Sequence, residues 1–381
     1  IVDAISPYNE QITALDKQVG AQYRRETLKD TSGASMMDPK TQVSKIHQTS
    51  ILDASKKTFE ANLVFALCRE YPNEYGEKIA NIALNTYVNQ CGQATLATAE
   101  ASRENGNSPN TVVSGAVAII GKKMVASAMD ASNVLMDLFQ FSKLNNAMDS
   151  FNYDEQLKTA KANKDTLLAG PDDKLSDSVA ACLSKDTQSV FIKFLLDFSK
   201  QEGGKPSTDA MIAAIWTTLG WSGMKSKKIT KGTICRLPWY SRIYSTIVGV
   251  AASADKHGEG SFCGIELGEL ISGFSFTRTA FLSLMGREPT DDELFEFQVL
   301  LGLIITNGPG TISAQGSKGA VSADGPEMPD RVQVNKAFIG FLTHTGFAHG
   351  GNGYEAAAFL IEQFKDTSLK AADDKNHGLD L

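Results

Sequence analysis

Residues 290–310, TDDELFEFQVLLGLIITNGPG, give the clearest fold signal in the chain. Thr290 and Glu293 form a capping-box sequence, in which each side chain can accept a hydrogen bond from the other residue's backbone N–H. The apolar residues that follow at helical spacing are Leu294, Phe297, Leu301 and Ile304. The segment Asn307-Gly308-Pro309-Gly310 then ends the helix, because glycine and proline both disfavour its continuation. The stretch therefore predicts an amphipathic helix followed by a tight turn.

Helical spacing of apolar residues recurs along most of the chain, and no β-rich zone interrupts it. The expected helices span residues 50–71, 76–104, 111–141, 177–200, 332–346 and 354–365. Residues 244–252 fit either a helix or a strand. Residues 142–176 are expected to form a connection with one short helix, and residues 313–330, rich in Gly, Ser, Asp and Pro, a loop. These patterns predict an all-α fold.

The best linker candidate is the sequence QEGGKPS at residues 201–207, and a basic stretch, KSKKITK, follows at residues 225–231. The basic stretch can be a solvated connection or a patch that binds the phosphates of coenzyme A. We therefore expect a helical region over residues 1–200, a linker with the basic stretch over residues 201–231, and a second helical domain over residues 232–381.

Composition and motifs exclude several classes of protein. The net charge of −7 is not typical of a protein that binds nucleic acid, which usually carries an excess of basic residues. No apolar run reaches the ~18 residues of a membrane span, and no secretory leader is visible. Five scattered cysteines without a C-x-x-C pair predict reduced thiols in the cytoplasm or an organelle matrix. We expect no metal and no nucleotide redox cofactor, because metal-ligand spacing, G-x-G-x-x-G and Walker motifs are missing.

Two glycine-bounded helix ends are candidates for chemistry. They are Asn307-Gly308-Pro309 and His349-Gly350-Gly351, about 42 residues apart with helices between them. Glycine lets the backbone approach a ligand, and a helix end offers unpaired backbone groups to it. Either segment alone can be an ordinary turn. Together they predict a pocket on which the two turns converge.

Three segments in order resemble the citrate synthase superfamily, most of all its citryl-CoA lyase and ATP-citrate lyase branch. The first runs from FCGIELGEL at residues 262–270, through Ser275-Phe276, to FLSLMGREPT at residues 281–290 and Glu293-Leu294. The second is ITNGPG at residues 305–310 with Ser313-Ala314-Gln315, similar to DHGPxxSxA. The third is GFAHGGNGYEA at residues 346–356, similar to GxxHGGAxEAA. The resemblance covers residues 228–365 and implies a multi-helical citrate-synthase-like fold.

The resemblance implies specific roles for these residues. His349 matches the histidine that hydrogen-bonds the carbonyl or hydroxyl oxygen of an oxo acid or citryl group, which is electrophilic catalysis. Asn307 replaces a second histidine that faces the thioester enolate, and an amide can donate a hydrogen bond but cannot titrate. Thr306 replaces the preceding aspartate, and Gln315 stands where the lyase branch often has histidine. The residues expected to bind substrate are Gly308, Ser313, Gln315, Gly350 and Gly351.

The family's catalytic aspartate lies in an Asp-Pro-Arg segment, and Asp38-Pro39-Lys40 resembles it. This placement implies either a circular permutation or a fused, degenerate second copy within the N-terminal region. Asp-Pro is also a common start of a helix, so Asp38 can have a purely structural role. If the resemblance holds, Asp38 is the acid or base that moves the α-proton.

Three functions stay open at this point. The first is an enzyme that makes or breaks a C–C bond between an acyl-CoA and a 2-oxo acid, as a homo-oligomer with a coenzyme A thioester as substrate. The second is a catalytically impaired relative that serves as a structural or regulatory subunit. The third is a generic helical adaptor. None of the three requires a membrane or nucleic acid.

Overall fold

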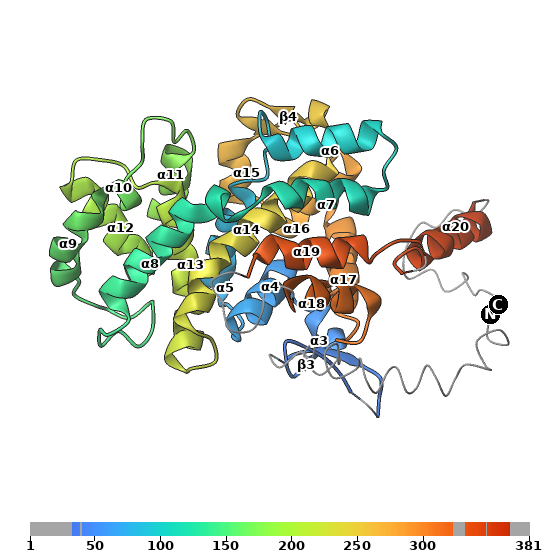
Figure 1. Cartoon of the computed structure of the whole chain (residues 1–381), viewed down its shortest axis with the longest axis horizontal. Coiled ribbons are helices and arrows are strands. Elements are labelled where there is room, and N and C mark those ends of the chain that lie inside the picture. The colour runs from blue at the N-terminus through green and yellow to red at the C-terminus, as the bar shows by residue number, and fades with distance from the viewer. Residues whose placement is uncertain (1–32, 39, 323–331, 348, 366–381) are drawn as a thin grey trace, which may run out of the picture.

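The computed structural model describes residues 33–38, 40–322, 332–347 and 349–365. The chain is mostly helical, with two very small sheets, so the predicted all-α fold class is confirmed (Figure 1). The helices up to residue 139 are α3 (Ile51–Ala54), α4 (Phe59–Cys68), α5 (Glu74–Asn85), α6 (Ala94–Glu104), α7 (Pro109–Ile119), η3 (Lys122–Val125) and α8 (Ala126–Phe139). The helices from residue 154 to residue 251 are α9 (Asp154–Ala160), η4 (Lys161–Asn163), α10 (Lys164–Leu167), α11 (Ser176–Ser184), α12 (Val190–Gln201), α13 (Thr208–Lys225) and α14 (Lys231–Ala251). The remaining helices are η5 (Ala254–Lys256), α15 (Leu267–Gly273), α16 (Phe276–Met285), α17 (Asp291–Ile304), α18 (Ile312–Ser322), α19 (Val334–Thr343) and α20 (Asn352–Phe364).

The two sheets are built alike, as three-stranded antiparallel meanders. The strands of the first are β1 (Ser35–Met37), β2 (Ser44–Ile46) and β3 (Thr49–Ser50), and those of the second are β4 (His257–Gly258), β5 (Ser261–Phe262) and β6 (Ile265–Glu266). In each sheet a two-residue turn joins the last two strands. The first turn residue has a left-handed backbone in both, with φ of 53° at His47 and 49° at Cys263.

The helices after each sheet follow one order. A ten-residue helix, α4 or α16, ends in a left-handed cap at Arg69 or Gly286. A proline comes three residues later in both cases, and a side-chain-capped helix follows, α5 or α17. Next come a turn, a helix pair (α6–α7 or α18–α19), another connection, and α8 or α20. Residues 35–139 and 257–364 are therefore two copies of one arrangement, called here the first unit and the second unit.

The two units pack against each other through α7 and α19, which lie side by side (Figure 1). A hydrophobic cluster fills this contact, with Val117, Trp239 and Val334 at its centre. The Asn110 side-chain amide donates to the carbonyl of Leu342 at 3.1 Å and to that of Thr345 at 2.7 Å.

The main hydrophobic core surrounds α13, which packs on α4, α5, α8, α12 and α14. Most of its side chains are buried, among them Trp216 and Trp221. One cluster of buried residues continues from Leu63 to Leu282. Between the linker candidate at 201–207 and the basic stretch at 225–231, the chain therefore forms α13, the central helix of this core.

Several predicted boundaries needed correction. Residues 50–71 form two helices, because the Thr58 hydroxyl accepts the Ala61 N–H at 3.1 Å and starts a new helix. Residues 76–104, 111–141 and 177–200 are each interrupted as well, and residues 244–251 belong to α14. The loop predicted over 313–330 was wrong in its first part, which is α18, whereas residues 323–331 lie outside the described residues. The capping box at Thr290 and the helices over 332–346 and 354–365 are confirmed.

Glu60 is a buried carboxyl that joins the two units. Its two oxygens accept from the Thr277 backbone N–H at 3.2 Å and from the Thr277 hydroxyl at 2.7 Å. Burial raises the pKa of Glu60 above its ordinary value of 4.5. Between pH 4.5 and the raised pKa, the folded state therefore binds more protons than the unfolded state. The free energy of unfolding consequently falls as pH rises through the folded pKa.

The Glu60→Gln variant is expected to flatten this dependence, because the amide stays neutral while keeping one acceptor oxygen. Urea denaturation at several pH values between about 4.5 and 7 measures it, as the slope of the free energy of unfolding against pH. The exposed Glu155→Gln variant on α9 is the control and should follow the parent. Equal slopes for Glu60→Gln and the parent would contradict the burial of a titrating carboxyl.

Candidate functional site

Two of the predicted site residues meet in the second unit. The Ser313 hydroxyl lies 3.0 Å from His349 Nε2, within hydrogen-bonding distance. Ser313 is buried in the first turn of α18, and His349 lies just before α20. Backbone hydrogen bonds between Gly346 and His349, both 3.0 Å long, hold the histidine turn in shape. The second and third family-like motifs are thus joined by a side-chain contact.

The Asn307 turn is fixed by contacts with the first unit. The hydroxyls of Ser35 and Thr306 are 2.6 Å apart. Gly308 is buried with φ of +84°, and a Cβ at this position would lie 3.2 Å from Met37 Cε. Glycine is favoured here by both its backbone conformation and its surroundings. The Asn307 side chain itself is exposed, so the turn is held by its neighbours and Asn307 faces solvent.

Gln315 points back to the same turn. Its side-chain amide and the Lys318 ammonium both donate to the Pro309 carbonyl, each at 2.9 Å. Gln315 also lines a cavity of about 620 Å³ between α18 and α19, together with Lys336 and His344. Among the described residues, its lining contains no carboxylate. Neither Asn307 nor His349 is among the residues that line it, so the predicted pocket shared by the two turns stays a prediction.

The two glycines after His349 allow the backbone conformation and the close contact of the turn. Gly350 has φ of +118°, in the region that favours glycine. A Cβ on Gly351 would lie 2.1 Å from the Phe347 carbonyl oxygen, a distance that no side chain tolerates. The two positions therefore need glycine to bring His349 to Ser313, whether or not they also contact a substrate.

Asp38 has a local role in the hairpin between β1 and β2. Its carboxylate accepts the backbone N–H groups of Lys40 at 2.9 Å and Thr41 at 3.1 Å, and pairs with Lys45 at 3.0 Å. These contacts hold the pKa of Asp38 far below its usual range, and the Thr41 bond is the largest cause. A carboxylate so stabilised is a weak base. Its predicted role in moving a proton therefore has no geometric support.

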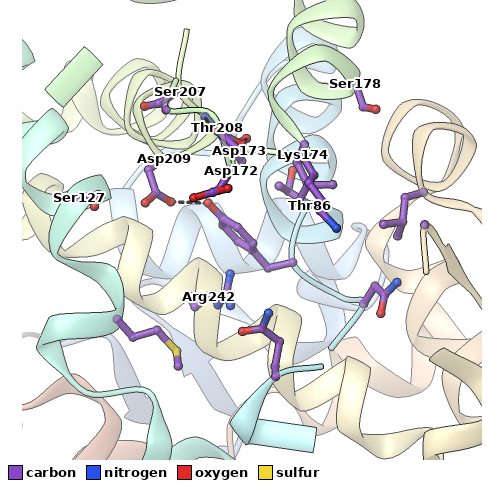
Figure 2. A pocket seen from close by; sticks show the side chains of 18 of the residues that line it. Thr86, Ser127, Asp172, Asp173, Lys174, Ser178, Ser207, Thr208, Asp209 and Arg242 are labelled. Carbon is purple, nitrogen blue, oxygen red and sulfur yellow. Dashed lines mark hydrogen bonds between the residues drawn. The ribbon is translucent and has the colours of Figure 1, made fainter. Parts of the chain in front are cut away.

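A cavity of about 1070 Å³, larger than the one between α18 and α19, borders the first unit and is also lined by residues of the second unit between Glu259 and Gly268; it was missed from the sequence (Figure 2). One wall consists of the turn after α5, with Asn89, and the start of α8, with Ser127. These segments occupy the same places in the first unit as the Asn307 turn and His349 in the second. The other wall comes from residues 165–178, the start of α13, and Arg242 on α14.

The centre of this cavity is a group of interacting polar side chains (Figure 2). The Tyr87 hydroxyl donates to Asp209, and the Arg242 guanidinium lies 4.1 Å from the centre of the Tyr87 ring. Burial raises the pKa of both Asp209 and Tyr87. Asp173 accepts from the Thr208 N–H at 2.7 Å and from its hydroxyl at 2.5 Å.

Charge distinguishes the two cavities. The large one is lined by seven carboxylates but only two cationic side chains, Lys174 and Arg242. In the part of the chain that the structure describes, the lining of the cavity between α18 and α19 has a cationic side chain, Lys336, and no carboxylate. Anions are favoured where positive charge dominates. An anionic ligand therefore suits the second unit and is disfavoured in the large cavity.

Within the described residues, no group of three or more His, Cys, Asp or Glu side chains could hold a metal ion. The five cysteines are unpaired. None of the described helices alone has the length and apolar character to cross a membrane, although Pro109–Ile119 and Lys122–Phe139, bent by 67° at their junction, meet those criteria as a pair.

Comparisons with known proteins give one structural likeness. No family model matches the sequence, and no curated protein matches it. Among solved structures, the chain is similar to citryl-CoA lyase from Hydrogenobacter thermophilus, with 17% sequence identity and a TM-score of 0.41. The match covers 57% of this chain and 84% of that chain.

Proposed function

We propose that the second unit binds an acyl-CoA thioester and a 2-oxo acid, or their citryl-type product, for making or breaking a C–C bond. The observation that carries this proposal is the hydrogen bond between Ser313 and His349. It joins two motifs of the resemblance that are separated along the chain, and Ser313 stands in the first turn of α18, the helix that follows the Asn307 turn.

The contact defines a role for the imidazole. Ser313 engages Nε2, and among the described residues no partner is bonded to Nδ1. Nδ1 is therefore the nitrogen that can meet a ligand oxygen. A hydrogen bond to one ring nitrogen fixes which tautomer the other presents. An N–H donor held in this way stabilises negative charge that develops on a carbonyl oxygen in the transition state.

The surrounding charge supports an anionic ligand. Lys318 lies beside the Pro309 carbonyl, and Lys336 and His344 line the neighbouring cavity, whose lining includes no carboxylate from residues 33–322 or 332–365. Coenzyme A esters and oxo acids are both anions, and cationic side chains attract them. A cavity of about 620 Å³ is within the range that holds a small organic ligand.

A second function, binding without turnover, is favoured by two observations. Asn307 cannot deliver a proton, because an amide does not titrate. Asp38 is held in its hairpin turn by Lys45 and two backbone N–H groups. Catalysis of C–C chemistry needs a group that moves the α-proton. A catalytically impaired relative, serving as a structural or regulatory subunit, would keep the ligand site and lack that group.

Calorimetry with coenzyme A, acetyl-CoA, oxaloacetate and citrate tests the proposal. The parent chain is expected to bind at least one of them, and His349→Ala to weaken that binding about tenfold or more, since it removes a charge-stabilising donor. Ser313→Ala should weaken it less, because the imidazole stays but loses its orientation. The control is Thr159→Ala, which removes a hydroxyl bonded only within α9.

The outcomes separate the two functions. Turnover supports the enzyme: condensation of acetyl-CoA with oxaloacetate and hydrolysis of the thioester release free thiol, which is followed with a thiol reagent, whereas cleavage of citryl-CoA leaves the thioester intact and is followed by the oxaloacetate formed. Binding that depends on His349 without turnover supports the impaired relative. If none of the four compounds binds at millimolar concentration, or if His349→Ala binds as the parent does, both versions of the proposal fail.

A further inference from the structure

His257 is a buried histidine at a point where the two units meet. It is the first residue of β4 in the second unit and is 8% exposed. Its ring contacts the end of α14 and the turn at residues 86–93 between α5 and α6 of the first unit, called here the Asn89 turn. A Cβ on Gly249 of α14 would lie 2.1 Å from the Val88 carbonyl oxygen, so this helix and the Asn89 turn are in close backbone contact.

The two ring nitrogens of His257 have different partners, and these fix one neutral tautomer. The Gln90 backbone N–H donates to Nδ1 at 3.0 Å, so Nδ1 carries no proton. Nε2 lies 3.1 Å from the Gly249 carbonyl oxygen, which can only accept, so Nε2 carries the proton. Both bonds are buried. A proton on Nδ1 would point at the Gln90 N–H, and the arrangement therefore fits the neutral ring.

Asn89 holds the same turn to the second unit. Its side-chain amide donates to the Gly258 carbonyl at 2.8 Å and to the Ser261 carbonyl at 2.9 Å. Its Oδ1 accepts the Cys91 backbone N–H at 2.8 Å and lies 3.4 Å from His257 Nδ1. Asn89 and Cys91 both line the cavity of about 1070 Å³. His257 therefore supports part of the wall of that cavity from behind.

The surroundings of His257 favour its neutral form. Burial is the largest cause and holds the pKa of the ring below its ordinary value of 6.5. Two charged side chains act on the ring: Arg103 of α6 lowers its pKa further, and Asp255 of η5 raises it. The Asn89 turn and α14 present backbone groups to the ring, and β5 presents the Phe262 side chain, with 5.1 Å between ring centroids.

We propose that His257 is a pH switch: its neutral ring holds the Asn89 turn against the second unit, and its protonation loosens this part of the cavity wall. A proton on Nδ1 removes the acceptor of the buried Gln90 N–H, which is unfavourable. The new ring N–H has Asn89 Oδ1 within reach at 3.4 Å and competes there with the Cys91 N–H. Asn89 transmits this change to the second unit, because its amide holds two carbonyls there. These contacts are independent of the site at His349 that the proposed function uses.

Hydrogen–deuterium exchange of the full 381-residue chain, followed by mass spectrometry, tests the switch. Between the lowered pKa and pH 6.5, each pH unit raises the open fraction by up to tenfold, because the open ring binds a proton that the closed ring does not. The protection factor of residues 87–93, corrected for the intrinsic exchange rate, is therefore expected to fall about tenfold from about pH 7.5 to about pH 5. The helix α9, which contains no histidine, is the internal reference.

His257→Gln should change by less than about threefold over the same range, because its amide does not titrate. The matched control is His344→Gln, which removes a ring bonded to the Gly340 carbonyl on α19 and should follow the parent. Equal pH dependence of residues 87–93 in His257→Gln and the parent, or constant protection of these residues in the parent, overturns the proposal.

Nuclear magnetic resonance of the parent chain with ¹⁵N-labelled histidine gives a second readout that needs no variant to fold. The His257 ring is expected to carry its proton on Nε2 at neutral pH and to titrate below pH 6.5. A ring protonated on Nδ1 at neutral pH, or one that titrates at or above pH 6.5, would overturn the switch.

Discussion

Gly340→Ala is expected to lower the free energy of unfolding by about 2 kcal/mol and to abolish the ligand binding that we propose at His349. Gly340 lies on α19 where it crosses α18. A Cβ there would lie 2.4 Å from the Gly316 carbonyl oxygen and 2.8 Å from Ala320 Cβ. Backbone cannot rotate away as a side chain can, so the two helices must separate. Ser313 and His349 sit on either side of this crossing and would move apart.

The repeated architecture supplies the matched control. Gly115 lies on α7, in the corresponding helix pair of the first unit, and a Cβ there would meet only Thr98 Cγ2 at 3.5 Å, an ordinary contact. Gly115→Ala should therefore stabilise by up to ~1 kcal/mol, because alanine is the better helix former. Urea denaturation followed by circular dichroism measures both variants. Changes of the same sign at the two positions would contradict the close crossing of α18 and α19.

This crossing also explains why part of the fold was mispredicted. Gly316, Gly319 and neighbouring serines in residues 313–330 have the composition of a loop, yet in α18 it is Gly316 that allows the close contact with Gly340. The capping box at Thr290 was predicted correctly because all of its hydrogen bonds are local. Local patterns predict helix starts, whereas the reason for a small residue can lie on another helix.

The same contrast between local and long-range patterns applies to the candidate site. Ser313 and His349 were found because each belongs to a short motif, and their contact follows from the helices around them. The acidic cavity of the first unit was missed because its walls come from separate segments between Thr86 and Gly268. The only sequence signal was the placement of Asn89 and Ser127 in the repeated unit. This signal can be used only after the internal repeat has been recognised, and the repeat is hard to recognise because the sequences of the two units have diverged.

The second large effect is expected at Trp221, in the middle of α13. Trp221→Ala should lower the free energy of unfolding by about 3–5 kcal/mol, as removal of a large buried aromatic side chain does. The ring is fully buried and packs edge-on against Phe191, with 4.8 Å between ring centroids. Its Nε1–H donates to the Leu144 carbonyl at 3.2 Å, so the variant also leaves a buried carbonyl without its partner.

Two further variants divide this loss into its parts. Trp221→Phe keeps most of the packing and loses the hydrogen bond, so about 1–3 kcal/mol is expected. Phe141→Ala removes an aromatic side chain that is 91% exposed, and should stay within about 0.5 kcal/mol of the parent. Guanidinium denaturation with linear extrapolation gives all three values. A loss below 1 kcal/mol for Trp221→Ala would mean that α13 does not form the centre of the core. The cavity wall that begins at Ser207 would then lose its support too, because that wall is the start of the same helix.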